Sequence, residues 1–442
     1  MYFLTASLQP AWSTSGVLRL DHFSTGLFAP SAEPPRGSGA PFAPFGIGPE
    51  ERAETSPSGL SVERLESPGE LLALGSACDA LARLRQPQSP FATRGWLTRW
   101  WDQYREDGFW LRDRFYVHTV RDAQHRLLAV APLLMTERPA RGPLRARGLS
   151  FFGSDKNVTE LRGMLCAPEH EDLATRALLE HLWRIREDWD WLIWHGVRRD
   201  SEAHARLSRL DEFRWLHETV EHVLPLPATW EEFRGTRSRN IKESLRKCYN
   251  SLKRDGHSFE FRVVTEPQEL AVALEKFFEL HQRRAQATHL VDHRDVFSLP
   301  QARRLMFEVA AASGEAPAMH AFQLVIAGEI VAMRLGFVLG DELYLYFSGF
   351  EPSWAQYSVM TTTVAEAIKW AIHNRLRMVN LSPGTDVSKT RWGAEQAVTC
   401  DGVLVSPTTR ARWVFGALTE LNLRSRPGTP LGRVVDRIRR GA

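Results

Sequence analysis

The sequence predicts an α/β protein made of two similar domains in tandem, each a mixed sheet flanked by helices. One observation is an order of elements (helix, antiparallel strands, helix, strand) that occurs in each half of the chain. Another is the length of 442 residues with 43% apolar residues, which is enough for two cores of ordinary size. The last is a pair of glycine-containing turns in the second half, typical of a meander of three antiparallel strands.

The chain divides into three predicted segments. Residues 1–60 are expected to be a flexible leader, because prolines and glycines crowd this segment and periodic apolar positions are few. An N-terminal domain is expected over residues 61–228 and a C-terminal domain over residues 229–442. We see no residue-level repeat between the two domains, so only the order of elements suggests a duplicated unit.

In the N-terminal half, a short strand is followed by one expected helix over residues 69–85, with leucines and Cys78 in an apolar stripe. A tryptophan-rich helix follows over residues 93–107, and a polar turn then joins two strands into a hairpin. The remaining elements are expected in the order helix, strand, helix, strand, over residues 171–188, 189–197, 201–210 and 219–226.

In the C-terminal half, residues 229–256 predict one or two basic helices that end at Gly256. A strand and two helices come next, followed by the three strands of the meander over residues 319–326, 329–339 and 342–350. A helix from about Gln356, a strand over residues 377–382 and a strand near residues 397–406 complete the predicted order, with basic helices at the end.

Bulk properties exclude several classes of protein. The net charge of only +3 gives no argument for nucleic-acid binding. The four cysteines are far apart and form no CxxC pair, so we expect no metal cluster and no disulfide framework, and a reducing cytoplasm is the simplest compartment. No apolar run has the length of a membrane span, and the first residues lack the regions of a signal peptide.

Five segments carry a family pattern when they are taken together. They are SPFATRGWLTRWWDQY from Ser89, SRNIKESLRKCYNSLKRDG from Ser238, FFELHQRRA from Phe277, LYLYFSGFEPSWAQYS from Leu343 and NLSPGTDVSKTRWG from Asn380. In order and spacing they resemble the CelD/BioF-like acyltransferases, a branch of the GNAT superfamily, and the match runs from about residue 60 to residue 406. The resemblance implies tandem GNAT-like domains, distantly like the Fem peptidyltransferases that take amino acids from tRNA. It also implies acyl transfer from a thioester, usually acyl-CoA, to an amine, often in exopolysaccharide or other cell-envelope pathways.

The sequence departs from this family pattern in three places. Val359 and Met360 stand where the family commonly has Pro-Gly, which bears on how the pyrophosphate of CoA would be held. Asn380 replaces an acidic residue and Ser388 replaces a tyrosine, and both changes bear on the proton transfer that the family uses.

The resemblance also implies where the donor would bind. Two parallel strands, Leu343–Phe350 and Arg377–Ser382, would separate so that the amide arm of the donor pairs between them. The next helix would present its N-terminus to the phosphates. The expected cofactor contacts are Phe350, Ser353, Gln356, Tyr357 and Ser358. An ordinary capped helix without a ligand explains the same serines.

Catalytic candidates follow the last strands. Lys389 would neutralise the oxyanion or a substrate phosphate, with Asp386 as its ion-pair partner or as a base. His281 would act as a base, and Arg284, which is on the same helix face, would position an acidic acceptor.

Each of these candidates also has a structural explanation. A lysine after a turn is usually solvated, and cations often gather at a helix end. Tyr344, Tyr346 and Trp392 would line the acceptor slot or pack in the core. The basic residues of 237–254 would contact phosphate or simply face solvent.

The leading hypothesis from the sequence is a cytoplasmic N-acyltransferase without a metal. Its donor would be acyl-CoA or an acyl-carrier protein, and its acceptor an amine of a sugar, amino acid or peptide, in polysaccharide or secondary-metabolite biosynthesis. One alternative is a Fem-like aminoacyltransferase that uses aminoacyl-tRNA. The other is a non-catalytic scaffold with a degenerate site.

Overall fold

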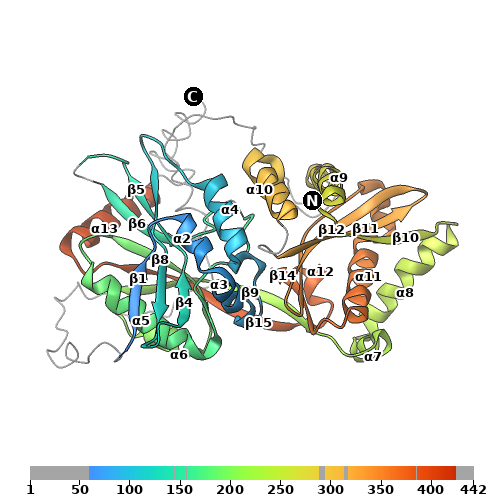
Figure 1. Cartoon of the computed structure of the whole chain (residues 1–442). Coiled ribbons are helices and arrows are strands. Elements are labelled where there is room, and N and C mark those ends of the chain that lie inside the picture. Colours follow the sequence, from blue (N-terminus) through green and yellow to red (C-terminus); the bar gives the residue numbers. More distant parts are fainter. Residues whose placement is uncertain are drawn as a thin grey trace.

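The computed structural model describes residues 59–142, 145–155, 157–287, 294–312, 317–384 and 386–424, with side chains described up to residue 420. Two lobes of strands and helices lie side by side (Figure 1). The elements before residue 210 build one lobe and most of those after residue 229 build the other. The last elements of the chain, β15 (Glu395–Val405) and α13 (Thr409–Arg424), lie against the first lobe. The predicted α/β class with mixed sheets flanked by helices is therefore confirmed.

The elements have the following bounds. The remaining strands are β1 (Ser61–Arg64), β2 (Arg112–Phe115), β3 (His118–Arg121), β4 (Leu127–Ala131), β5 (Leu133–Arg138), β6 (Ala146–Phe151), β7 (Leu165–Cys166), β8 (Trp191–Arg198), β9 (Phe213–Pro225), β10 (Phe259–Val264), β11 (Ala318–Ile326), β12 (Glu329–Leu339), β13 (Glu342–Phe350) and β14 (Met378–Pro383). The remaining α-helices are α2 (Pro68–Ala73), α3 (Gly75–Leu84), α4 (Arg94–Tyr104), α5 (Glu171–Arg184), α6 (Glu202–Ser208), α7 (Trp230–Thr236), α8 (Arg239–Arg254), α9 (Pro267–Gln286), α10 (Pro300–Ala311), α11 (Val359–His373) and α12 (Val387–Thr390). Short 3₁₀ helices are η2 (Pro90–Ala92), η3 (Pro168–His170), η4 (Val296–Ser298) and η5 (Pro352–Tyr357).

Among the described residues the strands form two sheets. The larger has the order β10-β11-β12-β13-β14-β9-β15-β8-β6-β5-β2, and the smaller has the order β1-β3-β4-β7. The pairs are antiparallel except for β6/β8 and β13/β14, which are parallel. Each half thus contains one parallel pair, followed by a short helix and a long strand, as expected for a duplicated unit.

The two halves exchange their long strands in the middle of the larger sheet. β9, from the first half, pairs with β14, and β15, from the second half, pairs with β8. β9 and β15 also pair with each other, and Figure 1 shows both at the junction of the lobes. In their register Thr219 faces Thr399, while His217 faces Asp401 and Glu221 faces Ala397, so an approximate two-fold axis passes near the threonine pair.

This axis reveals a short repeat that we did not see in the sequence. It superposes residues 219–225, TVEHVLP, on residues 399–405, TCDGVLV, with threonine, valine and leucine shared and an acid in the same place. Three of the seven positions are identical, and the resemblance is confined to this strand. Seven residues are too few to stand out in a chain of 442 without the strand register.

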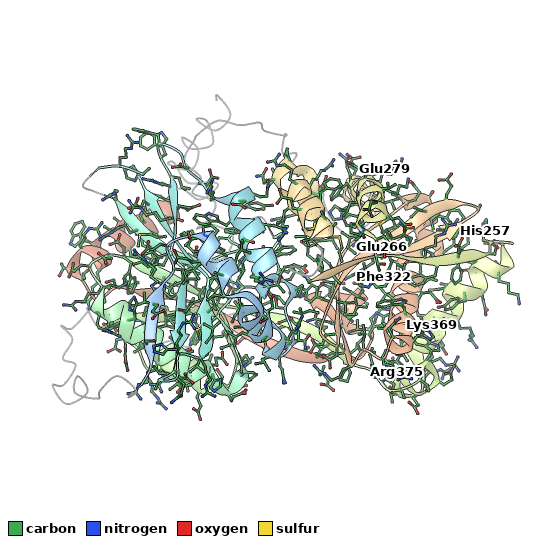
Figure 2. All side chains as sticks on the ribbon, viewed as in Figure 1. His257, Glu266, Glu279, Phe322, Lys369 and Arg375 are labelled. Carbon is green, nitrogen blue, oxygen red and sulfur yellow. The ribbon has the colours of Figure 1, made fainter. Side chains whose placement is uncertain are left out.

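Helices cover both faces of the C-terminal part of the larger sheet. Side chains alternate along β13: Tyr344 and Tyr346 belong to the core with α9 and α10, whereas Leu343 and Leu345 pack with α11. Figure 2 shows Glu279 of α9 and Lys369 of α11 on opposite sides of the sheet that holds Phe322. The core under α9 and α10 also contains tryptophans of α4, so one hydrophobic cluster joins the two halves.

Two local predictions differ from the structure. The helix expected over residues 69–85 is broken into α2 and α3, because Leu74 ends the first helix and Gly75 has a φ of +57°. Each strand of the predicted N-terminal hairpin is also broken in two. The first strand is divided into β2 and β3, and the second into β4 and β5, with Pro132 at the break between β4 and β5. The hairpin therefore contributes to both sheets.

Candidate active site

The site is built where β13 and β14 separate. The two parallel strands pair only at Glu342–Met378, Leu343–Val379 and Tyr344–Asn380. Beyond Tyr344, β13 continues along β12 to Phe350, whereas β14 continues along β9 to Pro383. A register shift in β12/β13 between Arg334 and Gly336 bends β13 at this place. Past Tyr344–Asn380, the facing edges of β13 and β14 form no backbone hydrogen bonds with each other. An extended ligand with amide groups could pair with these edges.

A cluster of charged side chains lies at this separation. The Tyr344 hydroxyl donates a hydrogen bond of 2.9 Å to Glu160 Oε2. Arg334 Nη2 donates to Leu345 O over 3.0 Å, and Lys389 Nζ donates to Pro383 O. Lys389 Nζ also lies 3.7 Å from Asp386 Oδ2. The cluster brings together two predicted catalytic residues, Lys389 and Asp386, and the predicted substrate contact Tyr344.

Glu160 reaches this cluster from the N-terminal half. It follows β6 on a loop whose backbone N–H groups at Val158 and Thr159 donate to Asp155 Oδ1 over 2.6 and 3.1 Å. The loop is attached to β13 because the Tyr346 hydroxyl donates to Val158 O. These contacts hold Glu160 next to the C-terminal strands.

Burial and charge set the protonation of the cluster. Burial raises the pKa of Glu160 to about 7, although Lys389, the Tyr344 hydroxyl and Arg334 oppose the rise. Burial also lowers the pKa of Lys389 and lowers the pKa of Arg334 to about 10. A carboxyl group with a pKa near neutrality can take a proton from a substrate and release it again, which is what a general base needs.

A second acid lies next to the cluster on the exchanged strand β9. Asn380 Nδ2 donates to Glu221 Oε2 over 2.8 Å, and Asn380 Oδ1 accepts from Ser382 N over 2.9 Å. Glu221 is buried, and burial raises its pKa. Its Oε1 has no hydrogen-bond partner among the described residues. Position 380 lacks the acid of the family pattern, and Glu221 from the neighbouring strand supplies a carboxylate beside it.

Asp386 and Arg284 have structural partners within the site. Asp386 caps α12, because its Oδ1 accepts from Ser388 N over 3.0 Å, and its other oxygen faces Lys389. Arg284 Nη1 donates to Ser348 Oγ over 2.5 Å, and its guanidinium lies 5.7 Å from the centre of the Phe350 ring. Burial lowers the pKa of Arg284.

His281 is placed in the core rather than in the cluster. It is fully buried, and its Nδ1 lies 3.0 Å from Ser348 O. Burial lowers its pKa. Its Nε2 lies 3.9 Å from Asp295 Oδ1, so the contacts of His281 are with residues that pack under β13, and its role as a base stays a prediction.

The loop after β13 holds most of the predicted cofactor contacts at the surface. η5 ends at Ser358, which has a φ of +53° and precedes α11. Ser353, Gln356 and Ser358 are exposed. Tyr357 is buried, and its hydroxyl donates to Asp255 Oδ2 over 3.1 Å. The first three can meet a ligand, whereas Tyr357 holds the loop against the end of α8.

Tyr346 and Trp392 take the core-packing role that the sequence left open. Tyr346 is buried among aromatic rings that include Phe91, Phe297 and Phe337. Trp392 is buried in the core beneath α11, and its carbonyl accepts from Arg237 Nη1 over 2.7 Å.

Glu160, Arg334 and Glu221 are the site residues that sequence reasoning missed. Glu160 is 184 positions before its partner Tyr344, in the other predicted domain. No spacing rule connects such positions, and each residue alone looks like an ordinary surface charge. The strand exchange, which the sequence does not reveal, is what brings Glu221 to β14.

Two searches of the described part of the chain had negative results. No group of three or more histidine, cysteine, aspartate and glutamate side chains in it could hold a metal ion. None of its helices combines the length and the apolar character needed to cross a membrane.

The comparison with protein families gives one match, which covers part of the chain. Residues 239–390 match the model described as an acetyltransferase (GNAT) domain. This range contains β13, β14, Arg334 and Lys389, but neither Glu160 nor Glu221. The C-terminal part of the chain is therefore similar to GNAT-type acetyltransferase domains, and the match does not reach the narrower CelD/BioF-like group. The sequence matches none of the curated proteins.

Solved structures resemble the chain over most of its length, at low identity. FemX is 10% identical, with 77% of this chain and 96% of FemX covered and a TM-score of 0.47. The C-terminal domain of a putative lysylphosphatidylglycerol synthetase from Agrobacterium fabrum is 11% identical, with 80% and 98% covered and a TM-score of 0.44. A tandem GNAT protein from the clavulanic acid biosynthesis pathway is 12% identical, with 79% and 99% covered and a TM-score of 0.39. At these TM-scores the likeness carries no argument about substrate or reaction.

Proposed function

We propose that the protein is an N-acyltransferase that moves an acyl group from a thioester donor to an amine. The donor is acyl-CoA or an acyl-carrier protein, and the acceptor is an amine of a sugar, amino acid or peptide in the cytoplasm. The observation that carries the proposal is the cluster of Glu160, Lys389, Arg334 and Tyr344 at the separation of β13 and β14. The GNAT domain match over the same strands supports it.

The donor binds in an extended form in this proposal. Its amide arm pairs with the free edges of β13 and β14, and its phosphate meets Ser353, Gln356 and Ser358 at the start of α11. The side chain of Val359 is buried, so it packs below the loop and does not cover these contacts. A phosphate can thus be held without the glycine that the loop lacks.

The chemical step needs a base and a stabilised oxyanion. The amine attacks the thioester carbonyl directly, and the proton that it loses passes to Glu160. The ammonium of Lys389, which belongs to the same cluster, stabilises the negative charge on the carbonyl oxygen. The C–S bond then breaks, and the departing thiolate takes up the proton that Glu160 received, so the products are an amide and a free thiol and the base is regenerated.

A second candidate donor is aminoacyl-tRNA, and α8 favours it. This helix carries six cations and one acid, and most of the cations are exposed: Arg239, Lys242, Arg246, Lys247, Lys253 and Arg254. It packs against α11, and its end meets the donor loop through Tyr357 and Asp255. Such a surface suits a polyanionic donor.

A donor screen tests the proposed function. The purified protein is incubated with acetyl-CoA, a long-chain acyl-CoA, an acyl-carrier protein or aminoacyl-tRNA, together with a panel of amino sugars, amino acids and peptides. Mass spectrometry detects the amide product. We expect product from a thioester donor, and Glu160→Gln should form it at least about 100-fold more slowly. Transfer from aminoacyl-tRNA alone would favour the second candidate, and no transfer or binding with any donor would favour the scaffold.

A further inference from the structure

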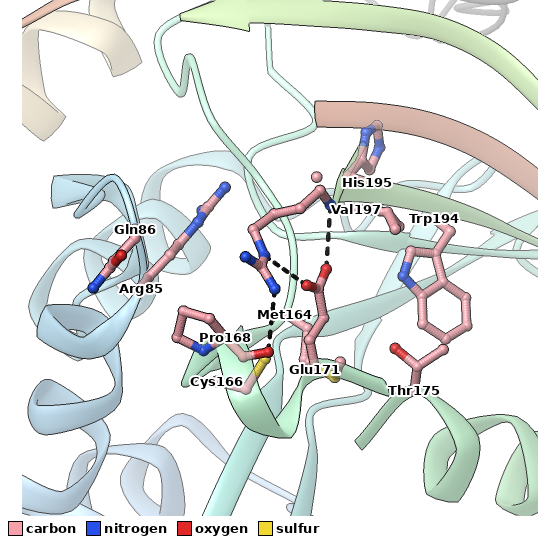
Figure 3. A pocket seen from close by; sticks show the side chains of 12 residues that line it. Arg85, Gln86, Met164, Cys166, Pro168, Glu171, Thr175, Trp194, His195 and Val197 are labelled. Atoms are coloured by element: carbon pink, nitrogen blue, oxygen red, sulfur yellow. Dashed lines mark hydrogen bonds and ion pairs between the residues drawn. The ribbon is translucent and has the colours of Figure 1, made fainter. Parts of the chain in front are cut away.

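The N-terminal half contains a pocket at the position that corresponds to the C-terminal site. β6 and β8 pair only from Gly148–Trp191 to Ser150–Ile193. Past Ile193, β8 leaves β6 and continues along β15, just as β14 leaves β13 and continues along β9 past Asn380. A pocket of about 30 Å³ lies beside this part of β8 (Figure 3). Its walls are residues 194–198, the start of α5, Cys166 and the end of α3 at Arg85.

The backbone closes this pocket to a long ligand. Gly163 and Gly196 lie face to face: a Cβ on Gly196 would be 2.1 Å from Arg162 O, and a Cβ on Gly163 would be 2.8 Å from His195 O. The loop at residues 162–163 therefore occupies the edge of β8 that would otherwise receive an extended arm. Only a ligand of a few heavy atoms fits the space that remains.

Two carboxylates that contact residues 195–198 already have partners. Glu171 accepts from Arg198 N over 3.2 Å and from Arg198 Nε over 2.7 Å. Asp401 Oδ2 lies 2.6 Å from His195 Nδ1 and 3.1 Å from His217 Nε2, and Asp401 Oδ1 accepts from Gly196 N over 2.9 Å. These two histidines hold the pKa of Asp401 far below its usual range despite burial. Neither acid offers an oxygen without a partner to a ligand.

The pocket side chains that still have hydrogen-bonding capacity for a ligand are mainly donors. Arg85 makes no side-chain hydrogen bond or ion pair with any described residue, and Figure 3 shows its side chain reaching from the α3 side into the pocket. Arg198 Nη2 donates to Pro168 O over 3.1 Å, which leaves its Nη1 for a ligand. The Thr175 hydroxyl adds a donor, and so does the Cys166 thiol, because burial raises its pKa to about 12 and keeps it protonated. A small pocket with two guanidinium groups and satisfied acids suits an oxyanion.

We propose that this pocket binds a small oxyanion, such as inorganic phosphate, sulfate or a short carboxylate, between Arg85 and Arg198. The site does not depend on acyl transfer at the C-terminal strands. Binding can therefore be measured whether or not a donor and acceptor are known.

Calorimetry and thermal shift with inorganic phosphate, sulfate and acetate test the proposal, with sodium chloride at equal ionic strength as the reference. We expect saturable binding of one of these anions to the wild type and a Tm that rises with its concentration. The choice among the three separates a phosphate or sulfate site from a carboxylate site. Arg85→Gln should weaken binding at least tenfold. Arg83→Gln, two residues earlier at an exposed position of α3, should bind like the wild type.

Two results would overturn the proposal. One is a wild-type protein that shows no saturable response to any of the three anions beyond that to chloride. The other is an Arg85→Gln protein that binds as tightly as Arg83→Gln. If Arg85→Gln does not fold, Arg85→Lys keeps the charge but loses the planar fork, and it should still weaken binding measurably.

Discussion

At the scale of single residues, the surroundings distinguish two glutamates that share a raised pKa. Burial raises the pKa of both Glu160 and Glu342 to about 7. Glu342 accepts from Arg377 Nη2 and from Gln88 N, so both of its oxygens are used within the protein. Glu160 accepts one hydrogen bond, from Tyr344, and lies at the open strand edges. The pKa alone would not separate a structural glutamate from a base, whereas the partners do.

The role of Glu160 gives the first prediction. Glu160→Gln keeps the size and the contact with Tyr344 but cannot accept a proton, so kcat should fall about 10²- to 10⁴-fold. The measurement is steady-state kinetics of amide formation with the donor found in the screen. Glu275→Gln, at an exposed position of α9, is the matched control and should keep wild-type turnover. Equal turnover in both variants would remove Glu160 from the mechanism.

The pKa of Glu160 gives a second prediction, on pH dependence. Burial raises this pKa to about 7, so Glu160 is mostly protonated at pH 6 and mostly ionised at pH 8. Because a base acts in its ionised form, kcat/KM should rise with pH, with a midpoint near 7, and level off above it. Since the pKa of the acceptor amine also enters the profile, two acceptors with different amine pKa values should be compared. If the midpoint of kcat/KM shifts with the amine pKa of each acceptor and shows no common step near pH 7, the assignment of Glu160 as the base is contradicted.

Lys389 carries a third prediction. Its side chain is 15% exposed, and burial lowers its pKa, so little water surrounds the charge. Lys389→Ala should lower kcat about 10²- to 10³-fold and raise KM much less, because oxyanion stabilisation belongs to the transition state. The control is Lys276→Ala, a lysine paired with Glu279 on α9. A larger effect on KM than on kcat would assign Lys389 to substrate binding.

At the scale of elements, local patterns in the sequence predicted most helices and strands. The turn at Ala327 and Gly328 has two positive φ values, as hairpin chemistry requires, and Gly256 ends α8 with a φ of +76°. The parallel pair β13/β14 was also expected, from the family resemblance. The break at Gly75 was not predicted, because the apolar stripe continues through it while the backbone does not.

The parts that sequence reasoning missed depend on contacts between distant segments. The exchange of β9 and β15 depends on which strands pair, and strand pairing has no local signature. Glu160 and Glu221 enter the site only through that long-range arrangement. Lys389, Asp386 and Tyr344 were candidates from the sequence because they follow or lie on the two strands that separate.

Gly349 gives a fourth prediction, about the packing of α9 on β13. A Cβ at this position would lie 2.5 Å from His281 N and 2.7 Å from Leu280 C, both of which are backbone atoms that cannot move alone. Gly349→Ala should therefore lower the free energy of unfolding by about 1–3 kcal/mol or more, as overpacking does. Chemical denaturation measures the change. Gly416→Ala is the control: among the described residues, no atom outside its own helix lies within 4 Å of a Cβ built there, so this helical site should become slightly more stable.

At the scale of the whole molecule, the two halves share both a sheet and a core. β15 of the C-terminal half lies between β8 and β9 of the N-terminal half, so removing it would expose two strand edges. One hydrophobic cluster contains Trp96 and Trp100 of α4 together with Phe277 of α9 and Phe337 of β12. The halves are thus similar units that complete each other, and neither is a closed structure by itself.

This arrangement predicts that the halves do not fold separately. Residues 59–228 expressed alone lack β15, and residues 229–424 expressed alone lack β9 and the aromatic residues of α4. Each fragment should show no cooperative thermal transition by circular dichroism and should bind a dye for exposed apolar surface. The two fragments expressed together should form a complex, because the β9/β15 pairing joins them.

A cleaved chain separates loss of covalent continuity from loss of the partner strand. A protease site inserted at Ala228, between β9 and α7, allows cutting after folding. We expect the cut protein to stay associated in gel filtration and to melt in one transition, since the shared sheet and core remain intact. A 59–228 fragment that is monomeric and melts as sharply as the uncut chain would show that β15 is dispensable to the first half. That result would mean that the exchange of β9 and β15 is a contact between independently folding domains and is not required for folding.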